Sequence, residues 1–228
     1  MITMIEYIFL ILFFIIVIVE LYGEHKENTK IFYASKPLAM PLLILFYIFG
    51  IVNSVGAEKI DWLIVVALIG GMTGDIFLML KDQEKWFLFG MIGFLVNQIF
   101  YIISFFIGVG DITPFNAWTL FLFGPVILII AFTVPRFINK TDELKVPVLV
   151  YMGAILLMHV AAVVRLAVIQ HFEIIFIYIG SILFIFSDSI LAMIKWEGDF
   201  KHGRLINLIT YFLAQFYITL GAFLSVLP

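Results

Sequence analysis

Long apolar stretches alternate along the chain with short polar breaks. Each stretch is close to the ~20 residues that an α-helix needs to cross ~30 Å of hydrocarbon at ~1.5 Å per residue. The alternation of polar and apolar residues that is typical of transmembrane β-strands is not found. The pattern therefore predicts an all-α, polytopic membrane helical bundle. Its eight transmembrane helices are expected at residues 2–21, 37–55, 61–80, 86–107, 115–135, 146–169, 173–194 and 205–226.

The breaks between these stretches are short and carry turn residues or charges. They cover residues 23–36, 56–60, 81–85, 108–114, 136–145, 170–172 and 195–204. None is long enough for a second domain, so we expect residues 1–228 to form a single transmembrane helical domain. The apolar N-terminus carries Glu6 and lacks a basic leader. We therefore expect it to be the first membrane helix and not a removed signal peptide.

The composition supports a membrane environment. Hydrophobic residues make up 64% of the chain and charged residues 13%, whereas soluble domains are roughly half apolar and a quarter charged. A net charge of −3 gives no reason to expect a nucleic-acid partner, and the absence of cysteine excludes disulfides and thiolate catalysis. We expect no cofactor and no histidine-based metal site, although carboxylates could hold a hard cation. The four histidines are scattered: His25, His159, His171 and His202.

Lysine and arginine are distributed unevenly between alternate breaks. The breaks on one side hold only Lys59, and Arg165 lies within the sixth stretch. Because cytoplasmic loops are rich in these residues, we expect both termini outside, in a bacterial inner membrane, with the other breaks in the cytoplasm. Those breaks hold Lys26, Lys30, Lys36, Lys81, Lys85, Arg136, Lys140, Lys145, Lys195, Lys201 and Arg204.

Two segments four helices apart resemble each other. GDIFLMLK (74–81) ends the third stretch and SDSILAMIK (187–195) ends the seventh. Helices four apart run in the same direction, so the likeness indicates a possible 4+4 parallel pseudo-repeat about an axis along the membrane normal. Coincidence is the alternative.

Asp75 and Asp188 are the candidate catalytic residues. Each lies six or seven residues before a cytoplasmic lysine, which places both carboxylates about 9–10 Å below that lysine level. An ionised Asp inside the membrane costs at least about 2.5–3.5 kcal/mol, so two at one depth suggest a shared site. The alternative is a pair of packing carboxylates bonded to Ser, Asn or Lys. Small neighbours could leave room for a ligand: Gly70, Gly71, Gly74, Ser187 and Ser189.

Six other polar residues are candidates for substrate binding. Alternative roles are a surface anchor for Lys36 and interhelical hydrogen bonds for the amides. We expect Glu20 to be solvated at the cytoplasmic surface, His159 to form a structural hydrogen bond, and Arg165 to reach outward or to pair with a carboxylate such as Glu173. The six candidates are Lys36, Gln98, Tyr101, Ser187, Asn207 and Gln215.

Six short motifs follow one another along nearly the whole chain. They are KPLAMPLLI (36–44), GDIFLML (74–80), FLFGMIGFLVNQIFYI (87–102), YMGAILLM (151–158), GSILFIFSDSILAM (180–193) and YFLAQF (211–216). In this order the chain resembles the YhhN-type membrane family, which includes the lysoplasmalogenases. One position departs from the pattern: where a His is expected before Tyr101, this chain has Gln98.

The resemblance implies hydrolysis of the vinyl-ether bond of a lysoplasmalogen, a lysophospholipid, to a fatty aldehyde and a glycerophospho-alcohol. Two intramembrane carboxylates suit this chemistry independently. A vinyl ether hydrolyses by protonation at carbon, and water then attacks an oxocarbenium-like cation, as in glycoside hydrolysis. In a poorly solvated site one carboxyl group would keep its proton as the acid. Which Asp is the acid stays open at this point.

Two other classes of function fit the same residues. A proton-coupled transporter or flippase could use Asp75 and Asp188 for coupling, and a parallel repeat is compatible with that. A lipid-binding or structural membrane protein would use them only for packing. A transporter would move substrate without forming product, and a binding protein would hold lipid unchanged.

Overall fold

The computed structural model describes residues 5–80, 84–107, 109–110 and 117–227. Within these residues the chain is helical and contains eight helices long and apolar enough to cross a membrane, which confirms the predicted fold class. Lys81, the first residues of the first and fifth predicted stretches, and most of the 108–114 break lie outside the described residues. The chain divides into two compact units, residues 1–104 with 219–228, and residues 105–218.

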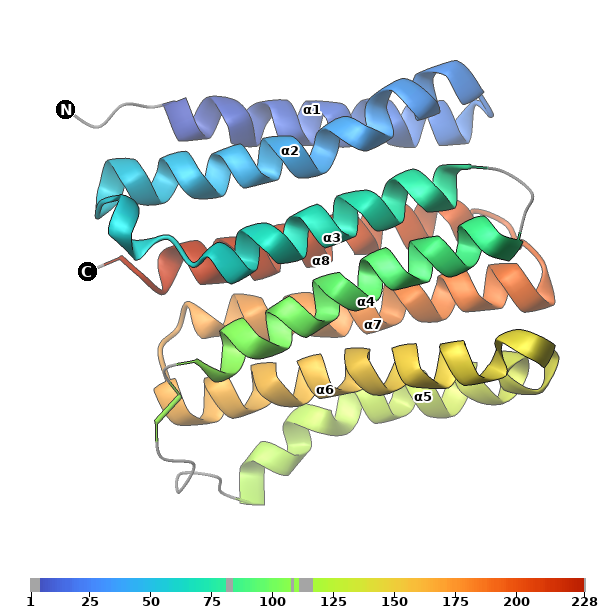
Figure 1. The fold of residues 1–228 in the computed structure, drawn as a ribbon. Helices are drawn as coiled ribbons and strands as arrows, with labels where there is room; N and C mark the ends of the chain where they lie inside the picture. The colour runs from blue at the N-terminus through green and yellow to red at the C-terminus, as the bar shows by residue number, and fades with distance from the viewer. Residues whose placement is uncertain (1–4, 81–83, 108, 111–116, 228) are drawn as a thin grey trace. The chain divides into compact units, whose positions relative to one another are not determined.

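The first unit contains four of the membrane helices. They are α1 (Ile5–His25), α2 (Thr29–Ser54), α3 (Trp62–Met79) and α4 (Glu84–Phe106), with the short 3₁₀ helix η1 (Ala57–Lys59) before α3. Figure 1 shows α2 running between α1 and α3, and it packs against both. Asp61 caps the first turn of α3 by accepting from the Leu63 amide (2.9 Å) and also accepts from the Ser104 hydroxyl (2.6 Å). One carboxylate therefore links the start of α3 to the end of α4.

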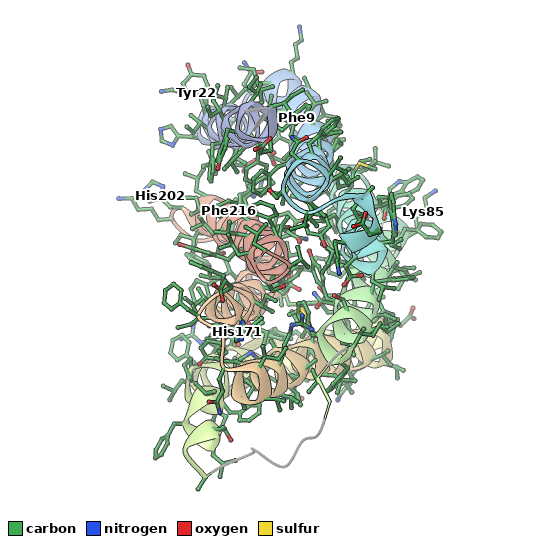
Figure 2. The ribbon with its side chains drawn as sticks, turned by 90° about the vertical axis from the view of Figure 1, so that its left-hand side faces the viewer. Phe9, Tyr22, Lys85, His171, His202 and Phe216 are labelled. Carbon is green, nitrogen blue, oxygen red and sulfur yellow. The ribbon has the colours of Figure 1, made fainter. Side chains whose placement is uncertain are left out.

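Helix α1 has two distinct faces. Tyr22 lies on the exposed face, and Figure 2 shows its side chain projecting away from the helix. Spacings of three and four residues place the exposed apolar side chains in one lipid-facing stripe. That stripe consists of Ile8, Ile11, Ile15, Ile18 and Tyr22. The opposite face is buried and consists of Glu6, Phe13, Val17, Glu20 and Gly23.

Helix α2 begins eight residues earlier than the sequence predicts. Asn28 caps it, because its side-chain oxygen accepts from the Ile31 amide (3.2 Å), and Thr29 is the first helical residue. The predicted break at 23–36 is therefore wrong over most of its length. The predicted second stretch starts at Pro37. In the structure Pro37 and Pro41 both lie inside α2.

Glycines bring α3 and α4 into close contact. A Cβ atom built on Gly70 would lie 2.8 Å from the Asn97 backbone nitrogen, and one on Gly93 would lie 2.6 Å from the Gly74 nitrogen. A Cβ on Gly74 would meet the Phe94 ring at 2.7 Å. The expectation that Gly70 and Gly74 leave room for a ligand is wrong, because α4 fills the space beside them.

Gly93→Ala is expected to lower the free energy of unfolding by about 1–3 kcal/mol, since the new methyl group would clash with backbone that cannot rotate away. Gly153→Ala is the matched control, because it changes a helical glycine with nothing within 4 Å of its Cβ position. The melting temperature of both variants in detergent checks this. Equal melting temperatures would contradict the packing role of Gly93.

The second unit contains the remaining membrane helices. Its elements are η2 (Ala117–Phe123), α5 (Gly124–Phe137), η3 (Ile138–Lys140), η4 (Asp142–Leu144), α6 (Lys145–Ile169), α7 (Ile174–Glu197) and most of α8 (Gly203–Leu224). The fifth candidate membrane span, Thr119–Lys140, combines α5 with 3₁₀ turns at its two ends. Helix α7 packs against both α5 and α6. Gln170 ends α6 in a left-handed conformation (φ 53°), which explains the short connection to α7.

Candidate functional site

Lys36 and Asp75 form a buried ion pair in the first unit. Lys36 Nζ lies 3.8 Å from Asp75 Oδ1, and the side chains are only 8% and 4% exposed. The ammonium group also lies 5.0 Å from the centre of the Phe32 ring. Lys36 is seven residues into α2, about 10 Å along the axis from the helix start. Lys36 is therefore an internal residue of α2 whose side chain is buried within the first unit, and its role in substrate binding stays a prediction.

Glu20 is buried beside this pair. Its exposed fraction is 0%, so the expectation of a solvated residue is wrong. Both carboxyl oxygens are buried and have no hydrogen-bond partner among the described residues. A Cβ atom built on Gly23, one turn after Glu20, would lie 3.1 Å from the Phe32 nitrogen, one turn before Lys36, so Glu20 and Lys36 lie at the same level of the packed helices. A buried carboxyl group without a hydrogen bond is an exception in proteins and calls for an explanation.

Three helices supply the charged cluster formed by Glu20, Lys36 and Asp75. Glu20 comes from the buried face of α1, Lys36 from α2 and Asp75 from α3. The Tyr33 hydroxyl, one turn from Lys36, donates to the Met79 carbonyl, one turn from Asp75 (2.6 Å). This bond fixes α2 against the end of α3 and holds the lysine and the aspartate at one level. The cluster contains two carboxyl groups and one ammonium group.

An uncharged polar group lies deeper in the same unit. Asn97 donates to the Ala67 carbonyl on α3 (2.6 Å), and Tyr101, one turn along α4, is completely buried. Gln98 is also completely buried, and neither of its amide atoms has a hydrogen-bond partner among the described residues. Ala67 and Asp75 are eight residues apart, which separates this group from the charged cluster by about 12 Å along α3. Unpaired buried amides of this kind are typical sites for bound water.

Asp188 lies in the second unit and accepts a hydrogen bond from the Tyr151 hydroxyl. The aspartate is on α7 and the tyrosine on α6. Asp188 is partly buried, in contrast to the almost complete burial of Asp75. Tyr151 was not a predicted site residue, although it lies six residues after Lys145 and Asp188 lies seven before Lys195. On antiparallel helices these similar distances, six and seven residues, could have identified the pair.

Ser187 and Asn207 bond to each other between α7 and α8. The Asn207 amide donates to the Ser187 carbonyl and hydroxyl oxygens (2.9 Å each), and the Ser187 hydroxyl lies 3.1 Å from the Asn207 carbonyl. Gln215 is completely buried two turns along α8 and donates to the Tyr211 hydroxyl (3.4 Å). For Asn207 these contacts favour the interhelical role, and substrate contact by Ser187, Asn207 and Gln215 stays a prediction.

His159 forms the structural hydrogen bond that we expected. Its Nδ1 lies 2.8 Å from the Ser181 hydroxyl, which donates to the Tyr178 carbonyl (2.7 Å). Arg165 donates to the carbonyls of Phe105 (3.3 Å) and Ile107 (3.1 Å). These carbonyls at the end of α4 are among those that a helix leaves without an internal donor.

The structure thus brings together Lys36 and Asp75, and separately Ser187 and Asn207. Glu20 was missed because a charged residue near the end of an apolar stretch resembles a solvated one. A signal was present, however: Glu6, Phe13 and Glu20 are spaced by seven residues, which places them on one face of a helix whose other face is apolar. In lipid, that face must point into the protein.

Comparison with known proteins gives one family. The model of the YhhN family matches residues 31–222. No curated protein and no solved structure matches the chain. The matched region contains Lys36, Asp75, Tyr151 and Asp188, whereas Glu20 lies outside it.

Proposed function

The chain belongs to the YhhN family, and from this membership and its buried charges we propose that it is a membrane-embedded hydrolase of lysoplasmalogens. The reaction cleaves the vinyl-ether bond and yields a fatty aldehyde and a glycerophospho-alcohol. The family is consistent with a hydrolase, and the eight apolar helices show a multi-pass membrane protein. The observation that carries the proposal is the ion pair of Lys36 and Asp75, buried inside the membrane-spanning helices.

A buried ion pair is costly to build in a membrane. Desolvation of the two charges commonly exceeds their attraction, so apolar residues of similar size would often be as stable or more stable. Ionisable residues inside membrane helices are therefore functional candidates by default. The sequence spacing places Asp75 about 9–10 Å below the cytoplasmic lysine level, and we propose that a lysolipid held by its phosphate at the membrane surface would place its vinyl ether near that depth. Its cost favours chemistry over packing as the role of Asp75.

The hydrogen-bond partners of the two aspartates support different roles. Asp188 accepts from the Tyr151 hydroxyl, and such a bond stabilises a carboxylate, so we assign Asp188 as the base. Asp75 belongs to a poorly solvated cluster of two carboxyl groups and one cation, which is neutral when it keeps one proton. We assign Asp75 as the acid that passes this proton to the substrate. That both act on one substrate is part of the proposal and rests on their equal depth in the sequence.

The reaction then runs in two stages. The protonated Asp75 gives its proton to the alkenyl carbon that does not carry oxygen, and the neighbouring carbon becomes an oxocarbenium ion. Water attacks that carbon and gives a proton to Asp188. The product of this first stage is a hemiacetal. In the second stage the bond between this carbon and the glycerol oxygen breaks. The glycerol oxygen takes the proton from Asp188, and the hemiacetal hydroxyl returns one to Asp75. Both carboxyl groups end in their starting states.

We also propose an orientation. Both termini lie outside and the charged cluster lies toward the cytoplasmic leaflet of a bacterial inner membrane, because the breaks on that side carry nearly all lysines and arginines. The exposed residues of these breaks include Lys85, Lys201 and His202. Figure 2 shows the side chains of Lys85 and His202 pointing outward. A substrate would then enter from the cytoplasmic leaflet.

The purified protein is expected to release aldehyde from an alkenyl lysophospholipid but no product from the alkyl and acyl analogues. The alkyl ether lacks the carbon that accepts the proton, and acyl hydrolysis needs a nucleophile that attacks a carbonyl. Mass spectrometry of the three reactions in detergent tests this. Fatty acid from the acyl substrate would indicate a lysophospholipase. Uptake into proteoliposomes without any product would indicate the transporter that the sequence leaves open.

A further inference from the structure

Glu20 provides a second carboxyl group near Asp75, the residue that we assign as the acid. It is completely buried, whereas the lipid-facing stripe occupies the other side of α1. Its oxygens accept no hydrogen bond from the described residues. An ionised carboxylate in such a place would lose its water shell without replacement, which costs several kcal/mol or more. Glu20 therefore keeps a proton.

Lys36 connects Glu20 with Asp75. The ammonium group lies 3.8 Å from Asp75, which is within ion-pair distance but longer than the ~2.7–2.9 Å of a strong charge-assisted hydrogen bond. On the other side, Gly23 of α1 packs against Phe32 of α2, which places Glu20 and Lys36, each one turn further along, at the same level of the two helices. One cation thus lies near both carboxyl groups. It can balance either of them, so a proton can reside on one or the other while the cluster stays neutral.

From this arrangement, and on the basis of the proposed function, we propose that Glu20 is a positioning residue that supplies Asp75 with the proton transferred to the alkenyl carbon. In this transfer the flexible Lys36 side chain moves between the two carboxyl groups, and its ammonium group passes one proton to Asp75 and takes one from Glu20. Asp75 becomes the neutral acid and Glu20 becomes the carboxylate paired with Lys36. When the hemiacetal breaks down, the proton returned to Asp75 goes back to Glu20 by the same path.

The proposal explains two features of the cluster. After Asp75 has donated its proton, the cluster holds two carboxylates and one ammonium group, and its net negative charge stabilises the oxocarbenium ion. In the resting state the cluster is neutral, which lowers the cost of keeping it inside the membrane. A single buried Asp–Lys pair would give neither a resting proton nor a net negative charge at the moment of cation formation.

The test compares Glu20→Gln and Glu20→Asp with Glu6→Gln. Glu6 is a matched control, because it is a buried glutamate on the same face of α1 that accepts a hydrogen bond from Asn53 (2.8 Å). Glu20→Gln keeps size and polarity but has no proton to give. We expect a folded protein whose kcat is lower by roughly 10²-fold or more, with KM little changed. Glu20→Asp should recover part of the activity, and Glu6→Gln should leave kcat unchanged.

Infrared spectroscopy gives a readout that does not depend on activity. The C=O stretching band of a protonated carboxylic acid should be present in the wild type, shift in D₂O, and disappear in Glu20→Gln but not in Glu6→Gln. An unchanged band in Glu20→Gln, or wild-type kcat in that variant, would overturn the proposal. If Glu20→Gln does not fold, loss of both band and activity in Glu20→Asp would overturn it as well. A wild type that releases no aldehyde would instead refute the hydrolase, and the band alone would then decide whether Glu20 holds a proton.

Discussion

Asp75→Asn and Asp188→Asn are each expected to reduce aldehyde release by roughly 10²–10⁴-fold while the protein stays folded. Asparagine keeps the shape of aspartate and can accept the same hydrogen bonds, but it cannot exchange a proton at neutral pH. Loss of a negative charge near the oxocarbenium ion adds to the effect. The measurements are the rate of aldehyde release and the melting temperature of each variant in detergent.

The double variant separates catalysis from packing. The effects of residues that act together in one mechanism are not additive. The double variant Asp75→Asn with Asp188→Asn should therefore lose much less activity than the product of the two single losses predicts. A packing role predicts the reverse pattern: the variants would unfold at lower temperature, and the folded fraction would turn over normally. Folded variants with wild-type rates would remove both aspartates from the chemistry.

Lys36→Met is expected to destabilise the protein by about 3–5 kcal/mol, because it leaves the Asp75 carboxylate buried without its cation. Lys36→Met combined with Asp75→Asn should recover most of this loss, since no unbalanced charge then remains. Thermal unfolding of the two variants in the same detergent measures the difference.

An exposed ion pair provides the control. Lys140 Nζ lies 3.5 Å from Glu197 Oε1, and its side chain is 51% exposed, so Lys140→Met should change stability by about 1 kcal/mol or less. Equal effects at Lys36 and Lys140 would contradict the importance of burial. If Lys36→Met instead left stability unchanged and raised KM, the substrate-binding role predicted for Lys36 from the sequence would be supported.

The number and type of the helices could be predicted from the sequence because lipid leaves few alternatives. A backbone in hydrocarbon must satisfy its own hydrogen bonds, so every apolar stretch of about 20 residues becomes a helix. The start of α2 was missed for a related reason. Residues 29–36 are mixed in polarity, and polarity was interpreted as a loop, although Asn28 is a good helix cap.

The candidate site could be predicted only in part. Asp75 and Asp188 stand out because carboxylates are rare in apolar helices, and Lys36 was found through its motif. The pairing of Lys36 with Asp75 could not be predicted, since the register between α2 and α3 depends on tertiary contacts such as that of Tyr33 with Met79. The four-residue spacing of Gly70 and Gly74 is typical of close helix packing, and the structure shows such packing against α4 in place of the expected space for a ligand.

The two prolines of α2 have a consequence for motion. Proline has no amide hydrogen, so Pro37 and Pro41 leave the carbonyls of Tyr33 and Pro37 without their usual helical donors. Lys36 therefore lies in the part of α2 whose backbone is easiest to bend. A movement of this segment away from α3 would have to break the ion pair with Asp75 and the bond between Tyr33 and Met79. If the proposed substrate binds through its phosphate, competition of that phosphate for Lys36 would weaken the ion pair, so the substrate itself would make the movement easier.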